Sequence, residues 1–395
     1  VAGRFEGTGS SSIKNIARYD GSAWQPLTPG DTATNEEIRA VEVVNEVIYV
    51  AGDFTEIGGV EARRVARWDP TNGWQALGGG LGYSTGTGDE QVNALAYHEG
   101  RLYAAGFFRQ PGNVDFDQFE SLAVWDGSGW EYLGNGISYP DQVFDILVEP
   151  DTVTGGDRVF IAGEFRWVNG ISSEADTITS KGVAAYLTAD SAWEAYDTRF
   201  EASSEVRTIA RVNEQLVIGG DWLQDFGGVS SRLAVWLEPV SSWVSWGYGA
   251  PDGRVYDIHS GEDNQVYVAG DFSRIGTIDG IVVGEPKYVS GLAYRHSDFS
   301  DSTWYSIGEG TAPDAGRRGV LAFALQVDET TSDTSIIVGG GFDAIGGQLT
   351  KGLAVYTDTG WYAWPDFPRG SNPTIKSIDV NGDSILVFGS DLLTR

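Results

Sequence analysis

The stretch AGDFTEIGGVEARRVARWD, residues 51–69, together with GWQALG at residues 73–78, holds the signals that decide the fold. A small residue and a glycine end an alternating apolar run, and Phe54 follows two places after the glycine. A second alternating run leads to Trp68, and a third begins at Trp74 after a polar turn. Short alternating runs separated by turn residues predict antiparallel β-strands rather than helices.

The glycine segment recurs along the whole chain. Most copies place a small residue, a glycine and then an aromatic residue at the same relative positions. The recurring glycines are Gly3, Gly52, Gly106, Gly163, Gly220, Gly270, Gly340 and Gly389. They lie about 50 to 70 residues apart, a period that indicates a repeat architecture. The spacing predicts seven units, with the weaker copy Phe388–Asp391 closing the series.

Each unit carries three further strand signals. An alternating run precedes the glycine segment, as in Val92–Leu95, and a hairpin follows it, as in Ala123–Trp130 with its Asp126-Gly127 turn. Asp-Gly between two aromatic-rich runs predicts a hairpin, because glycine adopts positive φ at little cost. The pattern predicts an all-β fold, a seven-bladed β-propeller of four-stranded antiparallel blades, as a single domain over residues 1–395. In such a ring, small Ala-Gly pairs would let two blades approach closely.

The repeat at residues 51–78 resembles that of a broad group of secreted bacterial propellers. It is also similar to the repeats of the fungal cortical polarity-marker family and, more distantly, to Kelch and galactose-oxidase propellers. The resemblance covers nearly the whole chain and implies the propeller fold, but it transfers no catalytic residue. Galactose-oxidase-type propellers need a cysteine-linked tyrosine at their copper, and this chain has no cysteine. We therefore expect no cofactor of that kind.

The chain is strongly acidic, with 56 Asp and Glu against 26 Lys and Arg and a formal net charge of −30. Such a chain repels phosphate, so nucleic acid is a poor candidate partner. No apolar run reaches the about 18 residues of a membrane span. Met is absent even at position 1, which indicates a processed or truncated chain. We expect a secreted or cell-surface prokaryotic protein. The scarcity of Lys fits marine or saline surroundings, and compositional drift explains it equally well.

The tryptophans have a structural explanation. Thirteen of the 14 occupy recurring positions of the repeat, such as Trp74 and Trp130 at the start of the last strand, and are expected to pack the blades. Only Trp167 falls outside the repeat.

No metal site is expected. The three histidines, His98, His259 and His296, share neither a repeat position nor a metal-like spacing, so we expect them to be solvated or hydrogen-bonded. The segment Asp379–Asp383 resembles the start of a calcium loop, but it lacks the later ligands and fits a hairpin turn better.

These observations favour a non-catalytic, secreted or cell-surface propeller that binds a protein partner or a surface glycan. The alternative is a carbohydrate-active enzyme, a glycosidase or lyase, with acidic residues at the propeller axis. Two or more buried carboxylates of raised pKa beside a sugar-sized cavity would favour the enzyme, and a shallow or plugged channel would favour the binder. A third possibility is that the propeller is one piece of a longer surface protein or assembly.

Loop lengths predict the binding face. Three connections from second to third strand, Arg109–Ser121, Arg166–Gly182 and Ser273–Gly291, are longer than the others. An off-pattern aromatic residue beside Arg is typical of an interaction anchor, although Trp167 could instead pack on its own blade. The predicted binding residues are Arg109, Asp115, Phe116, Asp117, Arg166, Trp167 and Asn169.

The two chain ends are predicted to close the ring together. The first strand of the last unit, Ile375–Asp379, occurs only at the C-terminus, whereas the hairpin Ile16–Leu27 occurs at the N-terminus. Both Val1–Phe5 and Ile385–Asp391 match the second strand, and only one of them can occupy it.

Overall fold

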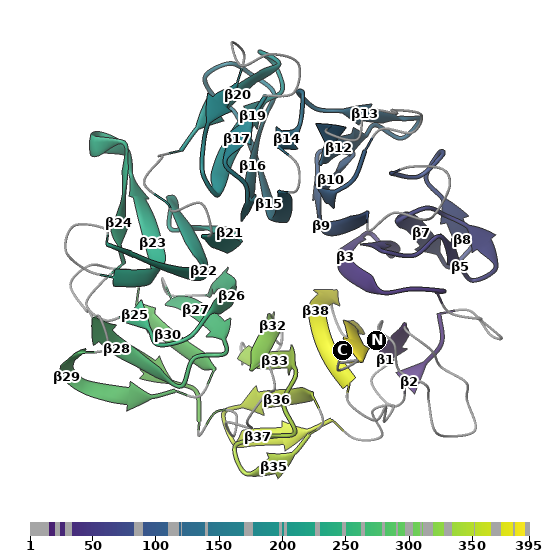
Figure 1. The fold of residues 1–395 in the computed structure, drawn as a ribbon. Coiled ribbons are helices and arrows are strands. Elements are labelled where there is room, and N and C mark those ends of the chain that lie inside the picture. The colour runs from purple at the N-terminus through teal and green to yellow at the C-terminus, as the bar shows by residue number, and fades with distance from the viewer. Residues whose placement is uncertain are drawn as a thin grey trace.

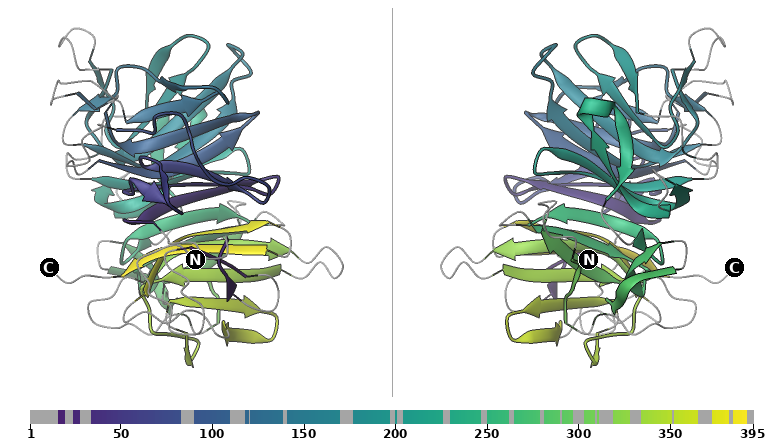
Figure 2. Two further views of the ribbon diagram at one scale, coloured as in Figure 1. Left: turned by 90° about the vertical axis from the view of Figure 1, so that its right-hand side faces the viewer. Right: turned by 90° about the vertical axis from the view of Figure 1, so that its left-hand side faces the viewer.

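The computed structural model has an all-β fold in which sheets surround a central axis (Figure 1). It describes residues 16–19, 24–27, 34–82, 90–109, 118–119, 121–138, 141–169, 177–196, 200, 204–225, 230–246, 250–261, 265–278, 281–289, 291–296, 303–308, 310, 319–327, 334–350, 352–364, 373–381 and 384–391. Seen edge-on, the strands run from one face of the ring to the other (Figure 2).

Six blades are each built from one continuous segment of four antiparallel strands, ordered from the axis outward. Blade I contains β3 (Ile38–Val44), β4 (Val47–Gly52), β7 (Val65–Asp69) and β8 (Gly73–Ala76). Blade II contains β9 (Gln91–His98), β10 (Arg101–Phe107), β12 (Leu122–Trp125) and β13 (Trp130–Tyr132). Blade III contains β15 (Gln142–Pro150), β16 (Asp157–Glu164), β19 (Val183–Leu187) and β20 (Ala192–Ala195).

The other three continuous blades follow the same order. Blade IV contains β21 (Glu205–Val212), β22 (Gln215–Asp225), β23 (Ser230–Leu237) and β24 (Ser242–Ser245). Blade V contains β26 (Val255–Ser260), β27 (Gln265–Gly270), β30 (Leu292–His296) and β31 (Tyr305–Ser306). Blade VI contains β32 (Val320–Val327), β33 (Thr334–Gly340), β36 (Leu353–Thr357) and β37 (Gly360–Ala363).

The two ends of the chain share one further four-stranded sheet, which we call the closing sheet. It contains β38 (Pro373–Asn381), β39 (Ser384–Asp391), β1 (Ala17–Tyr19) and β2 (Trp24–Gln25), ordered from the axis outward. Ala17 pairs with Val387 and Tyr19 with Ile385, so the C-terminal copy occupies the second-strand position. The competing segment Val1–Phe5 and the anchor Gly3 lie outside the described residues.

The prediction of seven blades is therefore corrected to six continuous blades. The strands left over at the two ends cannot form a blade separately, because each end has only half the strands that one requires. They reach four strands only by pairing with each other in the closing sheet. The all-β propeller class and the four-stranded antiparallel blades are confirmed.

Smaller sheets are present in addition to the blades. One four-stranded sheet, which we call the bridging sheet, joins segments that flank blades II and III. It contains β11 (Gln118–Phe119), β14 (Ile137–Ser138), β17 (Trp167–Val168) and β18 (Ile178–Thr179). A three-stranded sheet contains β25 (Ala250–Pro251), β28 (Arg274–Ile278) and β29 (Ile281–Tyr288). The remaining elements are β5 (Glu56–Ile57), β6 (Val60–Glu61), β34 (Ala344–Ile345), β35 (Gln348–Leu349) and the 3₁₀ helix η1 (Glu238–Val240). Within the described part of the chain, no helix has the length and apolarity that crossing a membrane requires.

The recurring glycine makes room for a bulge in the innermost strand of its own blade. Gly52 pairs with Ile38 and Ala51 pairs with Ala40, so Arg39 is an extra residue with no partner on β4. A Cβ on Gly52 would lie 2.1 Å from the Glu37 carbonyl oxygen, so only glycine fits there. The same register shift recurs in every continuous blade and in the closing sheet.

The small residue before that glycine serves the contact between blades. A Cβ at Gly219 of blade IV would lie 2.5 Å from Val255 of blade V. A Cβ at Gly339 of blade VI would lie 2.3 Å from Ile375 of the closing sheet. The Ala-Gly pair therefore has two tasks. Its first residue lets neighbouring blades approach, as predicted, whereas its second accommodates the bulge within the blade.

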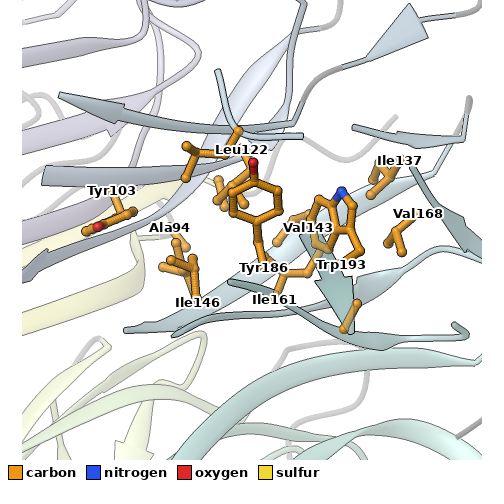
Figure 3. Packing of buried hydrophobic residues seen from close by; sticks show 14 of the residues in the cluster. Ala94, Tyr103, Leu122, Ile137, Val143, Ile146, Ile161, Val168, Tyr186 and Trp193 are labelled. Atoms are coloured by element: carbon orange, nitrogen blue, oxygen red, sulfur yellow. The ribbon is translucent and has the colours of Figure 1, made fainter. Parts of the chain in front are cut away.

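Apolar side chains fill the interfaces between blades, as the junction of blades II and III illustrates (Figure 3). The labelled residues come from both blades and from the bridging sheet: Ala94, Tyr103, Leu122, Ile137, Val143, Ile146, Ile161, Val168, Tyr186 and Trp193. Burial of such surface contributes about 25 cal/mol for each Å² removed from water. The ring is thus held by apolar contacts that pass from each blade to the next.

The repeat tryptophans pack the outer part of the ring, as predicted. The indole N–H of Trp243 donates to the Tyr196 carbonyl oxygen of the preceding blade at 3.3 Å, and that of Trp361 donates to Ile307 at 3.2 Å. Gly308, in the left-handed conformation at φ 58°, leaves space for the Trp361 ring. Trp24 lies in β2, and its side chain is outside the described part.

The bulge predicts an unequal response to two glycine substitutions. In Gly220→Ala the new methyl group would lie 2.0 Å from the Glu205 carbonyl oxygen, and we expect a loss of about 2–3 kcal/mol in unfolding free energy. Gly129→Ala is the matched control, because nothing lies within 4 Å of its Cβ position. Chemical denaturation measures both variants. Equal losses would contradict the role assigned to the repeat glycine.

The closing sheet predicts that deleting residues 375–395 lowers the melting temperature by at least about 10 °C, because β1 and β2 lose the strand that anchors them. A chain that ends after Asp391 keeps all four strands and should melt as the full chain does. Differential scanning calorimetry makes the comparison. An unchanged melting temperature in the larger deletion would refute closure by the two ends.

Candidate functional site

The inner strands of the six continuous blades and of the closing sheet surround an axial cavity of about 400 Å³. Its wall contains residues from β3, β9, β15, β21, β26, β32 and β38. The cavity is polar as well as apolar, since arginine, lysine, histidine and carboxylate side chains all reach it. The chemistry of the axis therefore depends on which positions of the inner strands face inward.

The bulged residues form a ring at one mouth of this cavity. Each bulge lies near the start of an inner strand, at the same end as the connections from second to third strand. The bulged residues are Arg39, Asn93, Phe144, Arg207, Tyr256, Leu321 and Lys376. All seven line a mouth cavity of about 170 Å³. Sequence analysis missed this ring, although a signal was present: the position after the recurring Val or Ile differs in size and charge from unit to unit, whereas the Val or Ile recurs.

The Arg207 guanidinium lies between two aromatic rings of the bulged set. Its Cζ is 4.3 Å from the centre of the Phe144 ring in blade III and 5.8 Å from that of Tyr256 in blade V. It also forms an ion pair with Glu205. These contacts hold the cation in place at the mouth, and cation–π contacts of this kind contribute about 0.5–2 kcal/mol.

A second group of cations lies where blade I meets the closing sheet. Lys376 forms an ion pair with Glu37, and Arg39 lies 3.2 Å from the same carboxylate. Arg39 also donates to Asp53 from Nε at 2.5 Å and from Nη2 at 2.9 Å. Bidentate pairs of this type orient a guanidinium as well as neutralise it.

Deeper in the channel, carboxylates join neighbouring inner strands. The Asp379 carboxylate accepts the N–H of Val380 at 2.7 Å and that of Val43 in the next sheet at 2.8 Å. Asp145 likewise accepts from its own neighbour Ile146 and from Ile209 in blade IV, both at 2.8 Å. An inner strand is the edge of its sheet that faces the axis. Its N–H groups that are not paired with the second strand need acceptors, and these carboxylates supply them.

Two further carboxylates repeat this arrangement. Glu42 of blade I accepts the Tyr97 N–H of blade II at 3.4 Å, and Asp257 of blade V accepts the Phe323 N–H of blade VI at 3.0 Å. The acidic residues of the channel therefore have a structural role, because each bonds the backbone of the following blade.

Burial raises the pKa of Glu42, Asp145 and Asp379. Burial and the Asp379 carboxylate raise the pKa of Glu42 to about 8, and the Tyr97 N–H offsets this only in part. Burial also raises the pKa of Asp145 to about 6 and raises that of Asp379. Burial lowers the pKa of His259, but Asp257 at 3.2 Å, together with Asp145 and Asp379, raises it by more.

Buried carboxylates of raised pKa beside a cavity were expected to favour an enzyme, and the channel has them. The geometry explains why this feature does not distinguish an enzyme from a binding protein here. Carboxylates of raised pKa do line a cavity of small-molecule size. Their oxygens, however, accept backbone N–H groups of the following blade, and these hydrogen bonds join the two blades. A raised pKa in this ring follows from burial at a blade junction and does not by itself indicate catalysis.

The bridging sheet brings together part of the predicted binding face. The first long loop supplies β11 and the second supplies β17 and β18, and all three belong to this one sheet. Trp167 in β17 is 41% exposed, whereas its neighbour Val168 is fully buried. The Arg166 side chain is exposed, and its backbone N–H donates to Asp141 at 3.1 Å. Asn169, at φ 59°, donates its backbone N–H to Gly136 at 3.0 Å.

Arg109 lies apart from that exposed group. It is only 9% exposed and donates from Nε to the Glu90 carboxylate at 3.0 Å. The buried Arg64 also reaches Glu90, at 3.7 Å, and donates to the Glu90 carbonyl oxygen at 2.9 Å. The three charges are buried together, so removing Glu90 would leave both guanidinium groups without this carboxylate. The remaining predicted residues, Asp115, Phe116 and Asp117, lie outside the described residues.

Glu164 connects the bridging sheet to the mouth of the channel. Burial, Glu205 and Asp141 raise the pKa of Glu164, while Arg207 and Arg166 lower it. Arg166 and the bulged Arg207 thus act on the same carboxyl group. The exposed part of the bridging sheet and the channel mouth therefore belong to one face of the ring.

Among the described residues, one group has metal-like proximity. Ligand atoms of His98, Glu99 and Asp157 lie within 4.8 Å of one another. The Asp157 carboxylate already accepts the Tyr103 hydroxyl, and the Arg101 guanidinium lies 3.7 Å from it. A cation and a hydrogen-bond donor at the same carboxylate fit a divalent metal poorly.

Comparisons with known proteins identify the fold. No family model matches the chain, and no curated protein matches it. A solved structure described as "YCF48 bound to D1 peptide" is similar, with a TM-score of 0.50 and 10% identity over 91% of this chain and 95% of that chain. The Dos1 propeller is similar with a TM-score of 0.40 and 10% identity over 91% of this chain and 80% of that chain. At this identity the YCF48 match shows the propeller fold alone, and the resemblance to secreted bacterial and fungal repeats stays an expectation.

The raised pKa of Glu42 predicts a pH-dependent effect of Glu42→Gln. Between its ordinary pKa of 4.5 and about 8, the folded state binds the Glu42 proton more strongly than the unfolded chain does. The stability it contributes is therefore complete below pH 4.5 and is lost as the pH rises to about 8. Glutamine keeps an acceptor for the Tyr97 N–H and cannot ionise. The unfolding free energy of the variant should therefore exceed that of the wild type at pH 8 by about 1–3 kcal/mol.

Urea denaturation at pH 5 and pH 8 measures this difference, which should shrink at the lower pH. Glu46→Gln is the matched control, because Glu46 is exposed in the turn between β3 and β4. A gain that is equal at both pH values would contradict the assignment.

Proposed function

We propose that this chain is a non-catalytic binding or scaffold propeller that engages a protein or surface glycan through the face on which the inner strands begin. The observation that carries the proposal is that the two parts of each inner strand have different roles. Deep positions bond neighbouring blades, whereas the bulged positions at the mouth vary in chemistry from blade to blade. Variable side chains on an invariant frame are typical of a recognition surface.

Trp167 and Arg166 extend this face beyond the mouth. Trp167 exposes a large apolar ring from a strand whose other residue is fully buried, so the strand fixes its position. Aromatic and arginine side chains on a rigid support are enriched among residues that dominate binding energy. The solved YCF48 propeller is described as bound to a peptide, and we take from it only that a propeller can hold one.

We further propose that the protein acts outside the cell or at its surface, alone or within a longer surface protein. The net charge of −30 motivates this setting. No second function is proposed, because the channel carboxylates already have acceptor roles in the ring.

Binding screens test the proposed function. The immobilised chain is presented with a glycan array and with a displayed peptide library, and each binder is titrated against Trp167→Ala. We expect at least a tenfold loss of affinity with a melting temperature within about 2 °C of the wild type, because an exposed side chain contributes little to stability.

Tyr362→Ala is the matched control, because Tyr362 is an aromatic residue of similar exposure, 48%, on the outer strand β37. Equal losses in the two variants would show that Trp167 is not an anchor. A Trp167→Ala variant that loses many degrees of stability would show that the ring packs the bridging sheet instead.

A further inference from the structure

The lining of the mouth cavity contains cations and no carboxylate, in a chain that is otherwise acidic. Nine side chains line it, and three of them are cations, whereas none is a carboxylate. The chain as a whole has 56 acidic against 26 basic residues. The lining residues are Arg39, Gln91, Asn93, Gln142, Phe144, Arg207, Tyr256, Leu321 and Lys376.

The cations approach the cavity from two sides. Arg207 comes from blade IV, whereas Arg39 and Lys376 come from blade I and the closing sheet, which lie on the other side of the ring (Figure 1). Each is oriented by an acidic partner outside the lining, Glu205 or Glu37. Paired cations of this kind remain able to share a ligand oxygen, since a guanidinium has five N–H donors.

Arg207 has a donor that the described residues do not use. Its side chain is 25% exposed, and its Nε is buried without a hydrogen-bond partner in the described part of the chain. The rings of Phe144 and Tyr256 lie against the guanidinium, at 4.3 and 5.8 Å from its Cζ. The exposed part of the guanidinium, and not the buried Nε, is what a ligand oxygen in the mouth can reach.

The deeper channel limits how far an anion could enter. Asp145, Asp257, Asp379 and Glu42 lie beyond the mouth and line the larger cavity. Glu42, with a pKa of about 8, is largely uncharged at neutral pH, but the aspartates still repel an anion that passes the bulged ring, so the favourable position is the mouth itself. Amide groups of Asn93, Gln91 and Gln142 complete the polar wall there.

Resting on the proposed function, we propose that the channel mouth is a carboxylate-binding site that accepts two carboxylates, from two acidic side chains of a peptide or from a free dicarboxylate. Arg207 binds one carboxylate oxygen, and Arg39 with Lys376 bind a second carboxylate on the opposite side. Aromatic residues flanking Arg207 contact the carbon chain of the ligand. The site thereby selects ligands with two carboxylates over neutral analogues of the same shape.

Isothermal titration calorimetry with the full chain tests this site. The probes are glutarate, a short Asp- and Glu-containing peptide, and the same peptide with Asn and Gln at those places. We expect an acidic probe to bind and the amide peptide to bind at least tenfold more weakly. Arg207→Gln should weaken the acidic probe at least tenfold, and Lys376→Gln should also weaken it.

Arg211→Gln is the matched control. Arg211 belongs to the same strand, pairs with Glu149 and does not line the mouth, so its substitution should leave binding unchanged. Melting temperatures identify any variant that fails to fold. If Arg207→Gln fails to fold, the affinity of Lys376→Gln for the acidic probe tests the site instead. Binding of glutarate without the peptide identifies a free dicarboxylate as the source, and the reverse identifies a peptide; either supports the site.

Three outcomes would overturn the proposal: no binding by any acidic probe, equal binding of the amide peptide, or equal binding by Arg207→Gln and the wild type. These outcomes are distinguishable from failure of the proposed function. If a partner binds through Trp167 but acidic probes neither bind nor compete with it, the proposed function is supported and the carboxylate site is contradicted. If the probes bind at Arg207 but no protein or glycan is retained, the carboxylate site is supported and the proposed function is contradicted.

Discussion

A backbone approach so close that a Cβ atom would lie about 2 Å from a carbonyl oxygen underlies the rest of this structure. The recurring glycine at the end of each second strand meets a carbonyl oxygen at the start of the inner strand, as Gly270 meets Arg254 and Gly340 meets Gly319. The inner strand bulges there and one residue has no partner. Every blade thereby gains the same local twist, and the same position is turned toward the axis.

The inner strands consequently serve two purposes along their length. At the mouth, bulged side chains such as Phe144 and Tyr256 reach the cavity and are free to differ between blades. Further along, carboxylates such as Asp257 supply acceptors for the N–H groups of the following blade. Each inner strand is a sheet edge that faces the axis, so its unpaired N–H groups need side-chain acceptors there. The raised pKa values of Glu42, Asp145 and Asp379 follow from the burial that this arrangement requires.

The long connections extend the frame because they fold as strands themselves. β11, β14, β17 and β18 pair across the junction of blades II and III, so Trp167 has a fixed position. The buried contacts of Arg109 and Arg64 with Glu90 secure the first of these connections. The described strands of these connections are therefore held to the ring by backbone hydrogen bonds, which reduces the entropy lost when a ligand binds to them.

The sequence by itself determined the repeat, the strand content, the structural role of the tryptophans and the closure by both ends, because each depends on residue types recurring at fixed spacing. Gly163 and Trp193 could be assigned this way, since alternation and turn chemistry are local properties. Only the tertiary structure decided that the glycine faces a bulge, that Arg109 is buried and that Arg207 reaches the channel mouth. These features depend on which strands of different blades meet at the axis, and that proximity joins residues many tens of positions apart.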